Sequence, residues 1–362
     1  MRPVYLHGCG LASALGPDLP TALHALRSAT RPRMRRYADL DWPVHALWPK
    51  EAAGAGWLAQ ARAWVCAAAA QSGALDGRRA GPLFVASSSL DIGLRETGLD
   101  WDGDPHAFAE AVGGWLDWRG PVFSVCNACT SSAQALLAAH GLLAGGEHDE
   151  ALVLGLELPN RYTVAGFGAM QLLSERAAQP MGAARNGLLP GEAVAALSLR
   201  ATPARWRLAG GANVVAGGNP AGIEAGALAQ AIRQALQRAG VAAADIGLVK
   251  LHAVGSPAND AVEARVLDQV AATGVHGRGR CAWVTFKPAL GHTMGASGAA
   301  EIALLSGCLA ARAWPSLDYA PDPLLAPRLA EVPHAHVRHA LLLFAGIGGG
   351  HAAWVLSDEA PT

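Results

Sequence analysis

A short apolar run, Pro121-Val122-Phe123-Ser124-Val125, leads directly into Cys126-Asn127-Ala128-Cys129-Thr130-Ser131-Ser132-Ala133. The run predicts a buried strand, and the Ala-rich stretch 131–143 has the spacing of a helix. Cys129 therefore lies in a turn between them, beside hydroxyl side chains that can cap the helix. A similar turn, Gly291-His292-Thr293-Met294-Gly295-Ala296-Ser297-Gly298-Ala299, precedes another Ala-rich stretch in the second half of the chain. This internal similarity predicts two related halves, each with a strand, a small-residue turn that holds a reactive side chain, and a helix.

Other apolar runs are bounded by Gly, Pro or polar residues, as buried strands often are. The clearest lie at 82–86, 121–125, 151–155, 246–251, 282–285, 340–344 and 351–356. Stretches with helical spacing lie at 59–71, 131–143, 223–239, 260–270 and 296–309. The alternation predicts an α/β protein whose parallel-rich sheets are covered by helices on both faces. We expect an N-terminal half of residues 1–202 and a C-terminal half of residues 203–362, with the boundary near Thr202-Pro203.

The composition excludes several classes of protein. Of the 362 residues, 51% are hydrophobic and 16% are charged, against about 25% charged residues in an average soluble domain; disorder needs the opposite balance. A formal net charge of −1 gives no bulk attraction to nucleic acid or to an anionic membrane. No uninterrupted apolar stretch has the length of a membrane-spanning helix, and the first residues lack the apolar block of a signal peptide. With six scattered cysteines, these features predict a cytoplasmic enzyme without a disulfide framework.

Cys129 is the first candidate for chemistry. A cysteine at a helix N-terminus feels the positive end of the helix dipole, so we expect the pKa of its thiol to be lowered. The alternative is a buried structural cysteine. Cys126 lies three residues earlier, but no second Cys-x-x-Cys pair accompanies it, which disfavours a metal or redox site.

Two histidines and a glycine-rich run complete the set of candidate motifs. His252 ends the apolar run 246–251, and His292 lies five residues after Lys287 in a Pro/Gly turn. One thiol with two histidines at strand ends suits thioester chemistry, in which the thiolate takes an acyl group. The run 344–351 can expose backbone N–H groups to an oxyanion. The alternatives are core histidines with satisfied hydrogen bonds and a tight hairpin.

Together, these motifs resemble the β-ketoacyl-acyl-carrier-protein synthases of the thiolase-fold superfamily. The resemblance also covers the segments 6–16, 166–174 and 187–193, so it extends in order over nearly the whole chain. It implies a thiolase-like α/β fold, with two pseudo-duplicated halves and a layered α-β-α-β-α architecture. A Cys-His-His set marks the elongating synthases, whereas initiating synthases have Asn at the third position and thiolases have a second Cys.

The resemblance implies a role for each reactive group. Cys129 would accept the growing acyl chain from phosphopantetheine, which arrives on an acyl carrier protein. His252 and His292 would donate hydrogen bonds to the thioester carbonyl of a malonyl-carrier substrate and stabilise the enolate that forms as CO₂ leaves. The backbone N–H groups of Cys129 and Ile347 would hold the tetrahedral oxyanion during attack on the acyl-enzyme. The reaction is decarboxylative Claisen condensation in fatty acid or polyketide synthesis.

Supporting roles are implied for three further residues. Lys287, paired with Glu263, would orient His292 and tune the local field. Gly346 belongs with Ile347 to the turn that forms the oxyanion site and, in the family, the gate for the acyl chain. No metal ion and no diffusible cofactor would be needed.

Some positions depart from the family's pattern. The two threonines that usually contact pantetheine are Val254 and Ser256 here, and Ile347 replaces the usual phenylalanine gate. Phe167, in the mid-chain segment, is expected to line the substrate site. These changes indicate a divergent, short member, such as one of a polyketide or aryl-polyene pathway. They also allow an alternative function as a chain-length-factor-like or weakly catalytic subunit of a ketosynthase heterodimer, and, more distantly, thioester hydrolysis or acyl transfer without condensation.

The resemblance also implies partners. They are an acyl carrier protein and a second subunit, in a homodimer or in a heterodimer with a second ketosynthase, joined through the sheet edge of the first half. Carrier proteins present an acidic helix, so the basic cluster 31–36 is the candidate docking patch. The alternative is that this cluster is a solvated loop.

Overall fold

The central feature of the fold is one continuous ten-stranded sheet. The computed structural model describes residues 1–37, 39–48, 53–98, 104–270, 281–325, 329 and 336–360. In spatial order the strands are β10 (Ala282–Val284), β9 (Ile246–Lys250), β11 (His339–Gly346), β12 (Gly350–Asp358), β8 (Trp206–Val215), β1 (Tyr5–Ser13), β7 (Ala193–Arg200), β6 (Glu150–Glu157), β4 (Leu83–Ala86) and β5 (Val122–Val125). Only Tyr5 with Arg207 and Leu6 with Trp206 pair across β1 and β8. The sheet therefore consists of two five-stranded halves joined by a short seam.

The two halves repeat the same pairing. Along the chain, the first half contains β1, β4, β5, β6 and β7, and the second half contains β8 to β12. In each half, the strand that comes first in the chain runs antiparallel to the one that comes last, as β1 does to β7 and β8 to β12. The second strand is parallel to the third and the fourth, as β4 is to β5 and β6, and β9 to β10 and β11. The fourth is antiparallel to the last. This correspondence confirms the two related halves that the sequence predicts.

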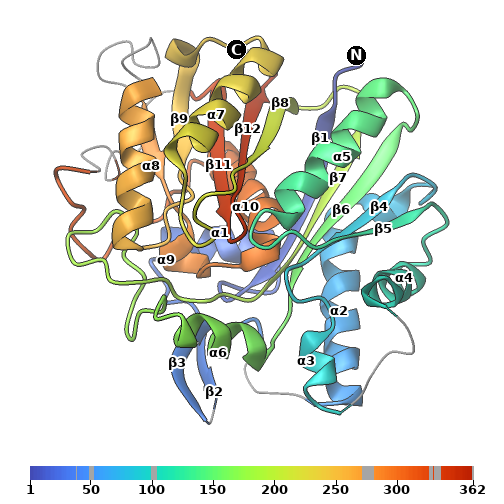
Figure 1. Cartoon of the computed structure of the whole chain (residues 1–362). Helices are drawn as coiled ribbons and strands as arrows, with labels where there is room; N and C mark the ends of the chain where they lie inside the picture. Colours follow the sequence, from blue (N-terminus) through green and yellow to red (C-terminus); the bar gives the residue numbers. More distant parts are fainter. Residues whose placement is uncertain are drawn as a thin grey trace.

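Helices lie outside and between the two halves of the sheet (Figure 1). Helices α2 (Ala55–Gln71) and α4 (Pro105–Trp115) pack on the outer face of the first half. Helices α7 (Ala225–Ala239) and α8 (Pro257–Val270) cover the outer face of the second half. Helices α5 (Ser131–Gly145) and α10 (Ser297–Ala311) share the middle core with strands of both halves. The result is the expected α-β-α-β-α order of layers.

Smaller elements border this framework. Helix α1 (Leu19–Arg27) adds to the middle core, and the hairpin β2 (Met34–Tyr37) and β3 (Leu40–His45) lies beside α6 (Arg161–Ala169) at the bottom of Figure 1. Short helices occur at α3 (Ile92–Arg95) and α9 (Lys287–Leu290). The predicted strands and helices all occur, most with slightly different ends. The sequence patterns do not predict the hairpin, the helices α1, α4 and α6, or the central strands β7 and β8.

Helix α10 is the most buried helix of the fold. Within the described ranges, the 18-residue window Met294–Ala311 is the one stretch that is long and apolar enough to cross a membrane, but 78% of it is buried inside the protein. Burial on all sides explains its composition, because a helix between two sheets has no polar face.

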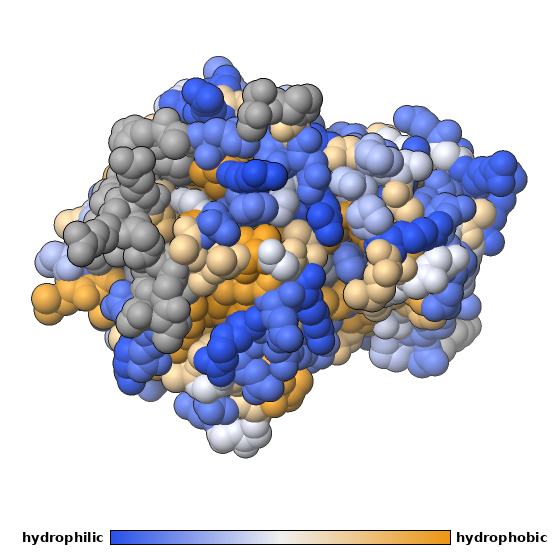
Figure 2. All heavy atoms as spheres, turned by 90° about the horizontal axis from the view of Figure 1, so that it is seen from above, coloured by the Kyte–Doolittle hydropathy of each residue, from blue (hydrophilic) through white to orange (hydrophobic). Residues whose placement is uncertain are grey.

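The surface is mostly hydrophilic with local apolar areas. Figure 2 shows blue residues over much of the face seen from above, with apolar residues gathered in its middle. On the whole described surface, the exposed large hydrophobic side chains are Met1, Met34, Phe123, Tyr162, Met170, Val215 and Leu324. Phe123 belongs to the edge strand β5, and Tyr162 belongs to α6.

The contact between α5 and α10 depends on a glycine. A Cβ atom added to Gly298 would lie 2.5 Å from the backbone nitrogen of Ala133 and 2.8 Å from Ser132 Oγ. The backbone N–H of Ala299 donates to Ser132 Oγ at 3.0 Å, so the first turns of the two helices are directly linked. A larger residue at 298 would push these turns apart.

We expect Gly298→Ala to lower the free energy of unfolding by about 1–3 kcal/mol, the usual cost of overpacking. The matched control is Gly141→Ala in the exposed middle of α5, where an added Cβ meets nothing within 4 Å. That change should raise stability by about 0.5–1 kcal/mol through helix propensity. Urea unfolding measures both, and equal gains in the two variants would contradict the proposed close contact.

Candidate active site

Cys129 lies in a strained turn between β5 and α5. The preceding residue, Ala128, has a φ of +46°, in the left-handed region that favours glycine. The hydroxyl of Ser131 stabilises the turn, since it accepts from the N–H of Asn127 at 2.8 Å and donates to the carbonyl of Ala128 at 2.7 Å. The turn holds the Cys129 side chain, which is 5% exposed, at the start of the helix. The predicted strand, turn and helix are therefore present.

The expected lowering of the Cys129 pKa is wrong for this structure. Burial raises the pKa of the thiol to about 11, and this effect exceeds the opposing effects of the Ile347 backbone hydrogen bond and the Lys287 charge. A thiolate in a site without water loses its solvation, and one helix terminus does not compensate for that loss. Cys129 is therefore a neutral thiol at pH 7.

A narrow pocket of about 90 Å³ opens onto Cys129. Its lining includes these residues predicted from the sequence: Cys129, Phe167, His252, Val254, Ser256, His292, Gly346 and Ile347. The structure thus brings the sulfur and both imidazoles, which are far apart in the chain, to one cavity. Lys287 and Glu263 lie behind the pocket and are fully buried.

His252 is held through its backbone. Its N–H donates to Glu263 Oε1 at 2.6 Å, and the next N–H, of Ala253, donates to Glu263 Oε2 at 2.7 Å. The predicted pairing of Glu263 with Lys287 is wrong. Glu263 projects from α8 toward the segment after β9 and accepts these two backbone bonds, so it positions His252 and has no direct contact with His292.

His292 is held by the mid-chain segment and by a hydroxyl. Its N–H donates to the carbonyl of Leu189 at 2.7 Å, and its carbonyl accepts from the N–H of Gly191 at 2.8 Å. Its ring Nδ1 lies 3.2 Å from Ser297 Oγ, and Lys287 Nζ lies 3.5 Å from the same oxygen. Lys287 therefore acts on His292 through Ser297. When Ser297 donates to Nδ1, the ring carries its proton on Nε2.

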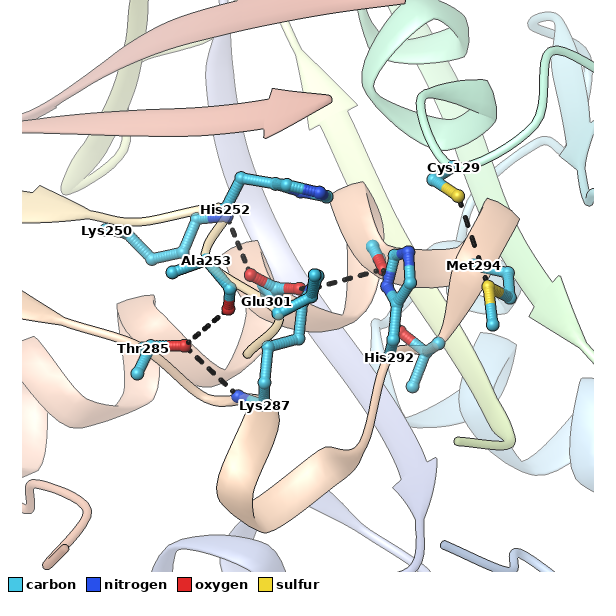
Figure 3. A network of polar contacts seen from close by, with 12 residues as sticks. Cys129, Lys250, His252, Ala253, Thr285, Lys287, His292, Met294 and Glu301 are labelled. Carbon is cyan, nitrogen blue, oxygen red and sulfur yellow. Dashed lines mark hydrogen bonds and ion pairs between the residues drawn. The ribbon is translucent and has the colours of Figure 1, made fainter. Parts of the chain in front are cut away.

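The partner of Lys287 is Glu301, on α10. The two side chains form a buried ion pair, and each is 1% exposed (Figure 3). Sequence reasoning missed Glu301, Ser297 and the neighbouring Met294. An acidic residue inside the otherwise apolar helix 297–311 is the signal that points to Glu301. Ser297 and Met294 carry no such signal, because small and apolar residues abound in this segment.

Both histidines are neutral at pH 7. Burial, and then the positive charge of Lys287, hold the pKa of His252 and of His292 well below the ordinary value. The ring centroids are 5.5 Å apart at an interplanar angle of 84°. Each neutral ring can donate one N–H hydrogen bond into the pocket. Neither ring carries the additional acidic proton of an imidazolium ion.

A second cavity, of about 580 Å³, lies on the other side of Cys129. Its lining is mostly apolar and includes Tyr162, Phe167, Met170, Met294 and Ile347. Met294 Sδ lies 4.0 Å from Cys129 Sγ (Figure 3). Cys129, Phe167 and Ile347 line both cavities, so the sulfur lies between a narrow pocket and a wide apolar space.

The basic cluster 31–36 is only partly available to a partner. Arg35 is buried and pairs with Glu192, and its Nη1 also donates to the carbonyl of Trp48 at 3.1 Å. Arg33 donates to the carbonyl of Leu47 at 2.6 Å. Arg35 is therefore not available to a docked partner. Its buried bonds instead stabilise the hairpin β2–β3.

The cysteines form no disulfide, and the described part of the chain has no group of three or more His, Cys, Asp or Glu side chains arranged to hold a metal ion. Cys126 is exposed, with its Sγ 3.7 Å from the carbonyl of Ser88. Cys126 thus points away from the pocket lining, and Cys129 is the cysteine that faces the histidines.

Residues 2–204 match the family description "Beta-ketoacyl synthase, N-terminal domain", and residues 211–317 match "Beta-ketoacyl synthase, C-terminal domain". The chain belongs to the β-ketoacyl synthase family. Among curated relatives, it is 31% identical over 266 residues to a 3-oxoacyl-[acyl-carrier-protein] synthase 2 of Rhizobium meliloti (strain 1021), a match that covers 66% of this chain. It is 32% identical over 218 residues, 54% of this chain, to the enzyme of the same name from Mycobacterium bovis. These matches span 61% and 50% of the relatives' own length.

Solved structures share the fold of this chain. One chain of the complex between a ketosynthase and its chain length factor from Xenorhabdus doucetiae superposes with a TM-score of 0.84 at 22% identity, and the match covers 99% of this chain and 98% of that one. The thiolase-like architecture is therefore shared over the full length, although most side chains differ.

The raised pKa of Cys129 predicts a steep pH dependence of its alkylation. Below a pKa of about 11 the thiolate fraction grows about tenfold per pH unit, so the rate with iodoacetamide should rise about tenfold per unit from pH 7 to pH 10. Peptide mass spectrometry separates this site from the other five cysteines, and the Cys129→Ala variant identifies its peptide. A rate that levels off near pH 7 would show that the helix terminus outweighs burial after all.

Proposed function

We propose that this protein catalyses decarboxylative Claisen condensation of an acyl group on Cys129 with a malonyl group carried on an acyl carrier protein. The observation that supports it most is the convergence of one thiol, two neutral imidazoles and two backbone N–H groups on a single pocket. Phosphopantetheine reaches the site as part of the carrier-bound substrate, and no resident cofactor or metal takes part.

The first half-reaction is transfer of the acyl group to the enzyme. Cys129 Sγ attacks the acyl thioester, and the N–H groups of Cys129 and Ile347 hold the oxyanion that forms. Both N–H groups lie close enough to the thiol to lower its pKa, which supports this role for them. The proton of the thiol leaves with the pantetheine sulfur, and the acyl chain occupies the wide apolar cavity.

The second half-reaction forms the carbon–carbon bond. The malonyl thioester enters the narrow pocket, and its carbonyl oxygen accepts hydrogen bonds from His252 and His292. The bond to the carboxylate breaks, CO₂ leaves, and the electron pair forms an enolate on the thioester. The enolate carbon attacks the acyl-Cys129 carbonyl, and collapse of the tetrahedral intermediate releases the Cys129 thiolate and a β-ketoacyl carrier product.

The departures from the family bear on substrate handling. Val254 is buried and apolar, so pantetheine loses one hydroxyl partner there, whereas Ser256 keeps the other. Ile347 has a smaller side chain than the usual phenylalanine, so it closes the passage between the two cavities less completely. These features favour a specialised synthase of fatty acid or polyketide synthesis, aryl polyenes included. They are also what motivates the alternative of a chain-length-factor-like subunit, since such a subunit needs little of the pantetheine site.

Intact-mass spectrometry separates these functions. After mixing with acyl-carrier thioesters, the wild type should gain the acyl mass, Cys126→Ala should do the same, and Cys129→Ala should not. With malonyl-carrier protein added, Cys129→Ala should lower β-ketoacyl formation by roughly 10³-fold or more, as loss of a nucleophile does. If a heterodimer that contains Cys129→Ala keeps its full activity, the subunit is a chain-length factor; if acylated enzyme yields free acid alone, it is a hydrolase.

We also propose that a second subunit, either another copy or a second ketosynthase, pairs with strand β5. This strand ends one edge of the sheet, and its Phe123 is 42% exposed although it stacks on Phe84 with ring centroids 5.1 Å apart. An open apolar edge is a template for strand pairing. Tyr162 and Met170 line the wide cavity and are exposed to solvent. A partner at this edge would cover these two side chains. The absence of disulfides supports a reducing, cytoplasmic location.

Phe123→Lys should convert the dimer to monomer in light-scattering measurements, because the charge opposes strand pairing at the edge. Leu324→Lys is the control, since Leu324 is 90% exposed and lies outside the sheet. An unchanged molar mass in Phe123→Lys would place the interface elsewhere.

A further inference from the structure

A second buried lysine, Lys250, lies behind the two histidines. It is the last residue of β9, two positions before His252, and its side chain is fully buried. Its Nζ donates to Glu301 Oε2 at 2.7 Å and to the carbonyl of Leu343 at 2.6 Å, and lies 3.6 Å from the centroid of the Phe344 ring. All of its donors are therefore directed at identified partners.

Packing does not explain a lysine at this position. The rest of β9 is apolar or glycine, and its residues pack into the core. Removal of a charge from water is unfavourable before pairing, and an apolar side chain of similar length would avoid this cost. The lysine therefore has a role other than filling space.

Each partner of Lys250 belongs to a segment that carries part of the site. Its own strand leads into His252. Glu301 is on α10, whose first residue, Ser297, contacts the His292 ring. Leu343 and Phe344 are on β11, which ends at the turn that contains Ile347. Lys250 thus links its own strand β9 to α10 and β11 through one atom, Nζ.

Glu301 is shared between two lysines. One carboxylate oxygen pairs with Lys287 and the other with Lys250 (Figure 3). Two cations therefore face the histidines across one carboxylate. Other charged or titratable groups near His252 include His351 at the start of β12 and two carboxylates of α8: Glu263 accepts from the His252 N–H, and Asp260 accepts from the N–H groups of Val254 and Gly255.

We propose that Lys250 is a positioning residue for the condensation: through Glu301 and the Leu343 carbonyl it holds His252, His292 and the Ile347 turn in one arrangement. This rests on the proposed function for its rate effects, but its effect on the histidines is independent of that function. The role differs from that of Lys287, which reaches His292 through Ser297 and has no contact with β11 among its hydrogen bonds and ion pairs in the described residues.

The test uses two variants of the full chain. Lys250→Met keeps the length of the side chain and removes charge and donors, whereas Lys250→Gln is neutral but keeps a donor for Glu301 or Leu343. If Lys250→Met does not fold, Lys250→Gln carries the test. The control is Arg205→Met, which removes a cation from the Arg205–Asp358 pair at the far end of β12.

The first readout is independent of catalysis. NMR of ¹³C-labelled histidine rings, assigned with His252→Gln and His292→Gln, follows the protonation of both imidazoles. Removal of the Lys250 charge should shift the titration of both rings to higher pH, because a neighbouring cation opposes protonation. Arg205→Met should leave both titrations as in the wild type.

The second readout is decarboxylation of malonyl-carrier protein. A displaced donor of this kind costs about 10- to 100-fold in rate, so kcat should fall by that factor in Lys250→Met with little change in KM. The acid limb of its pH profile should move upward with the histidine titrations. Arg205→Met should keep the wild-type rate.

The outcomes are distinct. Folded Lys250 variants with wild-type histidine titrations and wild-type rates overturn the proposal, and so does a loss of thermal stability alone. Shifted titrations in a protein whose wild type forms no β-ketoacyl product would support the role of Lys250 in arranging the histidines and would reject the proposed function.

Discussion

The close packing of α5 against α10 determines where Cys129 and His292 lie. The first turns of these helices meet at Gly298 and Ala133, with no room for a side chain between them. Cys129 precedes one of these turns, and His292 precedes the other. Because the two helices belong to equivalent positions of a repeated half, their N-termini meet at one place between the sheets. A single helix contact thus places the Cys129 thiol and the His292 imidazole next to one another.

Burial then controls the charge state of the site. Removal from water raises the pKa of Cys129 and lowers the pKa of His252 and His292, so all three groups are neutral in the resting protein. A neutral thiol suits exchange between thioesters, in which a proton moves from one sulfur to another. Neutral imidazoles suit stabilisation of an enolate, because they donate hydrogen bonds without protonating the carbon that must attack.

The charges that remain are confined behind the reacting atoms. Lys250, Glu301 and Lys287 form one buried cluster, and Glu263 binds the backbone of His252 from another side. Through Lys250 this cluster joins β9, α10 and β11 by hydrogen bonds and ion pairs. In front of them, Val254 and Ile347 line the narrow pocket, and Ile347 also lines the wide cavity. The buried charged side chains and the pocket-lining side chains therefore form two separate layers.

Short-range sequence patterns predict most of the strands and helices around the site and the place of Cys129 between a strand and a helix. The apolar run before Cys129, the capping hydroxyls after it and the similar turn around His292 are short-range patterns, so they predict the strand, the turn and the two related halves. The hairpin β2–β3 and α6 lack such patterns, because their residues are half-buried against distant segments. Tertiary structure alone decided the partner of Lys287, the role of Glu263, the contacts of Lys250 and the direction of the Cys129 pKa. The physical reason is that ion-pair partners and desolvation depend on which segments pack around a group, and those segments are distant along the chain.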